Sequence, residues 1–224
     1  MNVVLFPKGF CDCLSKRIAK FWWAPSGKER GVHWKSWDKV CISKKDGGIG
    51  FKDLYSQNIA HLAKQAWRIL ENPKAIWVQV LKAIYFPNED FKDATVGRAA
   101  SWMWKSIVYG RDFLLRNGRW LIGNGERVRI LEDKWIMNMD KNPVIRNLDV
   151  RFVKDVIVEG EGWNLNKLKK YFNGASVDKI IRTPVSLFGR EDRFNWPFRM
   201  DGNYTIKTGY YVVRNEKGVG NTKN

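Results

Sequence analysis

Cysteine and histidine, the side chains that most often bind zinc or form nucleophile–base pairs, are scarce: 224 residues contain 3 cysteines and 2 histidines. Cys11, Cys13 and Cys41 cannot all pair with one another, so a reducing, intracellular compartment is the simplest inference. With His33 they offer the right atoms for zinc, but their spacing fits no common zinc pattern and includes no Cys-x-x-Cys pair. We therefore expect no metal ion and no cofactor.

Long apolar runs are also missing, and no stretch approaches the roughly 18 residues that a membrane span needs. The apolar residues 3–6 form a run too short for a signal peptide, and Pro7-Lys8-Gly9 interrupts it. The sequence therefore predicts no membrane partner.

The residue sets that carry most enzymatic chemistry are incomplete as well. Metal-assisted phosphoryl transfer needs clustered carboxylates at strand ends, and only Glu132-Asp133 follows a predicted strand. The glycine-rich stretches 47–50 and 123–125 lack the Lys-Ser/Thr pair and the helix of a phosphate-binding loop, so we interpret both as turns. His61 lies on the polar side of a predicted helix, where a solvated histidine is commoner than a catalytic base. We expect no catalytic residue.

Acidic residues are too few to balance the basic ones. The chain has 40 Lys and Arg against 23 Asp and Glu, a formal net charge of +17 and a pI near 9.9. Such a domain repels itself unless an anion is nearby, and nucleic acid is the commonest such anion. A basic surface that only improves solubility is the simpler alternative. Hydrophobic residues make up 44%, which is ample for a core, so wholesale disorder is not expected.

Apolar periodicity predicts helices in the first half of the chain. Residues 57–70 repeat apolar side chains at helical spacing, residues 77–84 share a second apolar face, and the two helices should pack as a hairpin. Residues 101–116 form a third predicted helix. Alternation on either side of residues 123–125 then indicates a β-hairpin. The predicted fold class is α+β and mainly helical: amphipathic helices followed by a β-hairpin and a small mixed C-terminal part.

A series of short motifs lies between about Phe21 and Trp135. They are residues 21–23, 33–37, Cys41, 45–54, Asn58, 62–70, 81–87, 104–107 and 122–125. Their order and spacing together resemble the plant LINE-type (non-LTR) retrotransposon polyprotein.

The resemblance implies a thumb and connection region, after the reverse transcriptase palm and before a zinc-binding segment and an RNase H-like domain. The family's polymerase aspartates lie in a Tyr/Phe-x-Asp-Asp motif that this chain lacks, so no catalytic residue is carried over and we expect no enzyme activity of the chain alone. Residues 204–210 look like the opening of the zinc-binding segment, whose ligands would lie beyond Asn224. The predicted segments are 1–20 (N-terminal lead-in), 21–118 (helical, thumb- or connection-like), 119–136 (β-hairpin), 137–215 (small mixed region ending at the start of the zinc-binding segment) and 216–224 (disordered tail).

Basic side chains on the outer faces of these elements are the candidate contacts to template–primer phosphates. The helical pair carries Lys64, Arg68, Lys74 and Lys82, and the predicted hairpin carries Arg119, Arg127 and Arg129. Trp34 and Trp37 have basic neighbours and are candidates for base stacking. The expected partner is RNA and/or DNA, including an RNA–DNA duplex. The simpler interpretation of each basic residue is a solvated side chain whose stem covers apolar surface.

Two alternatives stay open at this point. The first is a decayed or domesticated structural or interaction fragment with no nucleic-acid role. The second is a small zinc-dependent enzyme that uses Cys11, Cys13, Cys41 and His33. Nuclear residence is suggested by the resemblance and by basic runs such as residues 167–170.

Overall fold

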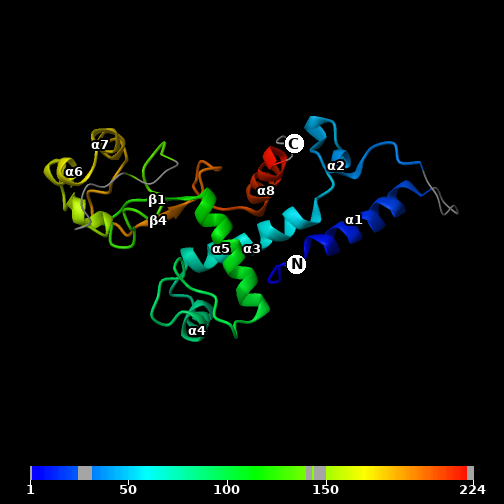
Figure 1. Ribbon diagram of the computed structural model, residues 1–224, viewed down its shortest axis with the longest axis horizontal. Coiled ribbons are helices and arrows are strands. Elements are labelled where there is room, and N and C mark those ends of the chain that lie inside the picture. The colour runs from blue at the N-terminus through cyan, green and yellow to red at the C-terminus, as the bar shows by residue number, and fades with distance from the viewer. Residues whose placement is uncertain (1, 25–31, 140–142, 144–149, 221–224) are drawn as a thin grey trace. The chain divides into compact units, whose positions relative to one another are not determined.

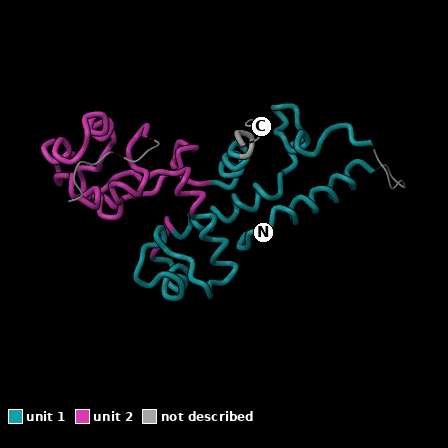
Figure 2. The backbone as a smooth tube through the Cα atoms, in the orientation of Figure 1, with its two compact units in different colours: residues 1–69, 74–111, 205–224 teal, residues 70–73, 112–204 magenta. Residues whose placement is uncertain are grey.

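The chain folds into two compact units rich in helices. The computed structural model describes residues 2–24, 32–139, 143 and 150–220, and Figure 1 shows their helices and short strands. Unit 1 comprises residues 1–69, 74–111 and 205–224, and unit 2 comprises residues 70–73 and 112–204 (Figure 2). Each unit therefore joins segments that are distant in the sequence.

Unit 1 contains most of the long helices. They are α1 (Lys8–Trp23), α2 (Trp37–Val40), the 3-10 turn η1 (Lys44–Asp46), α3 (Leu54–Glu71, whose last residues belong to unit 2), α4 (Ile76–Tyr85) and α8 (Ile206–Gly220). Helix α5 (Trp102–Asn117) begins in unit 1 and ends in unit 2. Unit 2 continues with β1 (Arg119–Leu121), the 3-10 turn η2 (Val153–Val156), β2 (Ile157–Val158), β3 (Gly162–Trp163), α6 (Leu165–Tyr171), α7 (Gly174–Ile181) and β4 (Arg193–Asn195).

These elements confirm the predicted α+β, mainly helical class. The linear division into segments 1–20, 21–118, 119–136, 137–215 and 216–224 stays a prediction, and neither unit is one continuous segment. Helix α8 continues to Gly220, and residues 221–224 lie outside the described residues. Among the described helices, none is both long and apolar enough to cross a bilayer.

Helix α3 follows the predicted pattern closely. Its apolar stripe, predicted as Ile59, Leu62, Ala63, Ala66 and Leu70, is buried throughout. The side chain of Asp53 accepts a hydrogen bond from the Ser56 amide at 2.7 Å and so stabilises the first turn. The helix is therefore positioned by its own periodicity and by a local cap.

Helices α3 and α5 pack at a contact that only glycine permits. A Cβ atom added at Gly110 would lie 2.5 Å from the carbonyl carbon of Leu62 and 2.7 Å from the Ala63 nitrogen.

The buried side chain of Asn58 accepts a hydrogen bond from the Phe6 amide (2.8 Å) and donates one to the Val4 carbonyl (2.9 Å). This pairing holds the extended N-terminal segment against α3, because it satisfies an otherwise buried amide.

An aromatic cluster determines the orientation of helix α4. The Trp104 ring stacks on Tyr85 with ring centroids 4.5 Å apart and on Phe86 at 5.4 Å, and it also contacts Phe91 at 5.8 Å. With the C-terminal end of α4 held there, Val78 is the buried residue of the helix.

The predicted apolar face of this helix is therefore wrong in part. Val80 and Ile84, expected to pack against α3, are 53% and 64% exposed. Periodicity identifies residues that share a face, but the contacts of Tyr85 and Phe86 with Trp104 decide which face is buried.

The predicted β-hairpin over residues 119–136 is also wrong in its pairing. Strand β1 pairs antiparallel with β4, with Trp120 opposite Phe194, and these strands are distant in the sequence. The residues after the turn instead contact the segment before η2, through an isolated bridge between Arg129 and Phe152. The returning segment touches β1 through the Trp120 amide, which donates to the Lys134 carbonyl at 2.7 Å.

A buried carboxylate explains why residues 119–136 do not pair as a hairpin. Asp192 accepts hydrogen bonds from the backbone amides of Gly123 (2.8 Å), Gly125 (2.9 Å) and Arg127 (2.9 Å). These amides are therefore not available for a hairpin ladder. A Cβ atom at Gly123 would overlap the Arg190 carbonyl, and Gly125 has a φ of +73°, so both glycines are required by the backbone.

Replacing Asp192 with Asn should destabilise unit 2 by about 2–3 kcal/mol, because the amide nitrogen of Asn cannot accept the hydrogen bonds of a buried donor. Hydrogen exchange at Gly123, Gly125 and Arg127 measures this locally and should accelerate. Asp178→Asn, at an exposed position on α7, is the matched control and should stay within about 0.5 kcal/mol of the parent. Unchanged protection of the three amides in Asp192→Asn would show that the carboxylate does not hold the loop.

Candidate nucleic-acid interface

The predicted contacts on the helical pair are largely open to solvent. Arg68, Lys74 and Lys82 are exposed, whereas Lys64 is half-buried and already has an interaction within the protein. Lys64 and Arg68 lie one turn apart on α3, so their side chains share one side of that helix. The three exposed residues could meet a phosphate without any rearrangement of the core.

Arg68 is oriented by an aromatic neighbour. Its guanidinium lies 5.2 Å from the ring centroid of Trp77 and donates a hydrogen bond to the Gln65 side chain at 3.2 Å. A cation over an indole ring is stabilised by the ring quadrupole, and it keeps its other N–H groups free to donate. The pair therefore presents a fixed basic group beside an aromatic surface.

The three arginines predicted on the hairpin are placed differently. Arg119, Arg127 and Arg129 are each half-buried. The Arg127 guanidinium lies 5.6 Å from the ring centroid of the buried Trp120, and Arg129 forms an ion pair with Glu132 at 2.5 Å. Packing inside unit 2 thus engages two of the three, and their role in binding stays a prediction.

The two tryptophans predicted to stack on bases also differ. Trp34 is 80% exposed. Trp37, the first residue of α2, is half-buried with its ring centroid 5.2 Å from that of Phe51. Phe51 in turn contacts Trp22 at 4.9 Å. Trp37 therefore belongs to a small aromatic group, while Trp34 projects into solvent.

Two further basic surfaces were not among the predicted contacts. Their residues are exposed and are spaced along helices: Lys8, Lys16, Arg17 and Lys20 on α1, and Lys167, Lys169, Lys170, Lys179 and Arg182 on or next to α6 and α7. Helices α6 and α7 contact each other, so the second set is brought together within unit 2. The i, i+4 spacing of Lys16 and Lys20 in the sequence indicates that both lie on one side of α1, and it could have identified the first of these surfaces.

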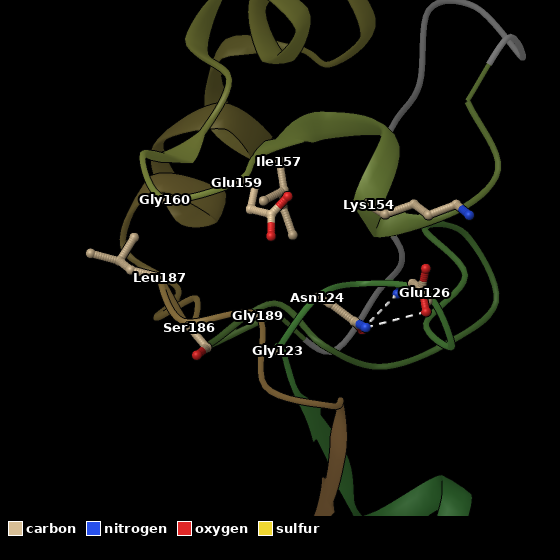
Figure 3. Close-up of a pocket in the computed structure, with 10 residues that line it drawn as sticks. All are labelled: Gly123, Asn124, Glu126, Lys154, Ile157, Glu159, Gly160, Ser186, Leu187 and Gly189. Carbon is tan, nitrogen blue, oxygen red and sulfur yellow. Dashed lines mark hydrogen bonds between the residues drawn. The ribbon is translucent and has the colours of Figure 1, made fainter.

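The glycine loop at residues 123–125 borders a cavity of about 310 Å³ in unit 2 (Figure 3). Its walls include the carboxylates of Glu126 and Glu159 together with Lys154. Asn124 donates a hydrogen bond to the Glu126 side chain at 3.2 Å (Figure 3). Two carboxylates would repel a phosphate, and the loop amides of Gly123 and Gly125 are bonded to Asp192. The structure therefore favours a turn at this loop.

The three cysteines differ in how far they are buried. Cys11 and Cys41 are buried and Cys13 is exposed, and the described residues contain no group of three or more Cys, His, Asp or Glu side chains placed to hold a metal ion. Burial raises the pKa of the Cys41 thiol to about 11. A thiol with this pKa is protonated at neutral pH, which is the opposite of what a nucleophile or a zinc ligand requires.

The histidine on α3 is hydrogen-bonded to a neighbour on the same helix. Burial lowers the pKa of His61, and its Nε2 atom lies 3.0 Å from the Gln57 side-chain nitrogen one turn earlier. Its neutral ring therefore adds no positive charge to the α3 surface at neutral pH.

Comparison with known proteins finds relatives of the chain in Arabidopsis thaliana. The chain is 37% identical over 145 residues to a protein of Arabidopsis thaliana named "Uncharacterized mitochondrial protein", a match that covers 64% of the chain and 93% of that protein. The chain belongs to the family of this mitochondrial protein. No family model and no solved structure matches the chain.

A longer relative covers nearly the whole chain. It is an Arabidopsis thaliana protein named "Putative ribonuclease H protein", 27% identical over 222 residues and 95% of the chain. The chain spans 36% of the length of this relative.

Alkylation of the cysteines tests the burial of Cys41 directly. At pH 8 in the folded protein, iodoacetamide should modify Cys13 readily and Cys41 at least about 100-fold more slowly, because the thiolate fraction of a group with a pKa near 11 is that small. Peptide mass spectrometry measures both rates, and unfolding in urea should remove the difference. The folded pKa of Cys41 lies above its unfolded value, so the protonated thiol contributes to the free energy of unfolding. This contribution is complete below pH 9 and is lost as the pH rises toward 11. Equal rates in the folded protein would contradict the burial of Cys41.

Proposed function

We propose that this chain is a nucleic-acid-contacting part of a retroelement-derived protein, without catalytic activity of its own, and that it binds template–primer phosphates through basic helix faces. The observation that carries the proposal is the position of Arg68, Lys74 and Lys82, which are exposed beside helices whose apolar residues form a core. The net charge of +17 supports the proposal, because an excess of basic residues is the electrostatic footprint expected of a polyanion-binding protein.

Two sequence relationships support a nucleic-acid partner. The longer relative carries the name of a ribonuclease, and the motif order resembles the LINE-type reverse transcriptase polyprotein. Several motif residues, including Asn58, Trp104 and Gly123, have structural roles in this fold. The resemblance therefore supports a shared scaffold, and the exposed basic residues are the part that would contact an RNA–DNA duplex. The same proposal includes an intracellular location, with the nucleus as the candidate compartment.

A second candidate function is a structural or interaction fragment with no nucleic-acid role. It is favoured by the exposed apolar residues of α4, where Ile76 is 85% exposed and Val80 and Ile84 lie one and two turns further along. Such a stripe is more typical of a protein-contacting surface than of a phosphate-binding one.

The salt dependence of binding distinguishes the two candidates. Fluorescence anisotropy with a labelled RNA–DNA duplex and with single-stranded RNA, measured across a salt series, should give a slope of several units in log K against log salt. The triple variant Arg68→Gln, Lys74→Gln, Lys82→Gln should lower the magnitude of this slope by about 2–3 for the duplex, because each phosphate contact contributes about 0.9.

The matched control removes the same number of charges from another exposed place, through Lys39→Gln, Lys44→Gln and Lys45→Gln. This control should change the slope by less than about 1. An equal loss in the two triple variants would show that net charge alone drives binding and would refute the residue assignment. If the parent does not bind even at low salt, the nucleic-acid proposal is refuted and the structural alternative is favoured.

A further inference from the structure

A cleft of about 600 Å³ lies in unit 1 between α1 and the segments that include α2 and the start of α3. On the α1 side it is lined by Asp12, Lys16 and Lys20, and on the other side by Trp37, Asp38 and Asp53. Its volume is within the range of pockets that bind small organic molecules. It combines charges of both signs with an aromatic ring.

The two lysines supply a place for phosphate. Lys16 and Lys20 are exposed and lie one turn apart on α1, so both ammonium groups can reach the same anion. Neither of them is needed for the burial of α1, which rests on Cys11 and Ala19.

The aromatic wall is fixed by packing. The Trp37 ring contacts Phe51, which contacts Trp22, so its orientation is held by aromatic neighbours. Trp37 stays half-buried and still lines the cleft. A fixed indole ring is a stacking surface for a nucleobase, at about 1–3 kcal/mol per stacked base in single-strand binding proteins.

The carboxylates decide which base suits the cleft. Asp53 already accepts a hydrogen bond from the Ser56 amide and lies 4.0 Å from the Arg214 guanidinium. Asp12 and Asp38 are exposed, and an ionised carboxylate can only accept hydrogen bonds. With more carboxylates than lysines around it, the cleft does not favour a bare polyanion; its ligand must bring donors as well as a phosphate.

Guanine meets that requirement best among the bases. Its Watson–Crick edge presents two neighbouring N–H donors, which match the two oxygens of one carboxylate, whereas adenine and cytosine offer one amino group there. We propose that the α1–α2 cleft binds a single unpaired guanine nucleotide, with its base on Trp37, its donor edge at Asp38 or Asp12, and its phosphate at Lys16 and Lys20. This inference rests on the proposed nucleic-acid function and adds a base preference to it.

Nucleotide titration tests the inference. Guanosine 5′-monophosphate should bind at least about tenfold more tightly than the adenosine, cytidine and uridine monophosphates, as expected for one bidentate contact to a base edge. Chemical-shift changes in the intact chain, followed at the indole N–H of Trp37, report on binding at this cleft. Equal affinity for the four nucleotides, or no shift at Trp37, would overturn the inference.

The variants separate the parts of the site. Asp38→Asn or Asp12→Asn should remove the preference for guanine while leaving the affinity for adenosine monophosphate within about twofold. Lys16→Gln with Lys20→Gln should reduce the affinity for guanosine monophosphate to that for guanosine, and Lys44→Gln with Lys45→Gln should have no effect. A guanine preference that survives both aspartate variants would overturn the assignment of the carboxylates.

The duplex experiment keeps the two proposals apart. Asp38→Asn should leave duplex binding and its salt slope unchanged, because the Arg68, Lys74 and Lys82 contacts do not involve the cleft. A chain that binds the duplex but shows no guanine preference would refute the cleft alone. A chain that binds neither would refute the proposed function as well.

Discussion

Unit 2 depends on one interaction: the buried carboxylate of Asp192 accepts hydrogen bonds from three backbone N–H groups. A buried charge is tolerated when hydrogen bonds to fixed donors replace its hydration, and a loop with alternating glycines can present three amides to one point. Once Asp192 is held there, β4 follows directly beside β1, and Trp120 packs against Phe194 with ring centroids 5.2 Å apart. The glycine loop at residues 123–125 thus binds a carboxylate of the protein itself.

Unit 1 is built on a comparable constraint, in which a polar or small residue permits close packing. Gly110 lets α5 approach α3, and Asn58 pairs with the backbone of the N-terminal segment. Tyr210 of α8 accepts a hydrogen bond from the Asp53 amide at 3.0 Å, so α8 packs beside the start of α3. These contacts involve motif residues such as Asn58 and Asp53, so part of the motif pattern reflects the scaffold. Exposed basic residues of the same motifs, Arg68 and Lys82, stay available to a partner.

The distribution of charge over that scaffold separates two kinds of basic residue. Arg127 and Arg129 support packing in unit 2, where one lies over an indole ring and the other pairs with a glutamate. Arg68 also contacts an indole ring, that of Trp77, but on a surface open to solvent. Arg129 would have to give up its ion pair with Glu132 to bind a phosphate, whereas Arg68 is exposed and has further N–H groups that can donate.

The sequence by itself determined the local elements and the total charge. Helix α3 and its buried stripe follow from spacing along a few turns, since the 3.6-residue period is a local property of the backbone. Only the tertiary structure decided which face of α4 is buried, that β1 pairs with β4, and that α1 and α2 enclose a cleft. Each of those outcomes depends on a contact between residues far apart in the chain, such as Tyr85 with Trp104 or Asp192 with Gly123, and spacing within one segment carries no information about such a contact.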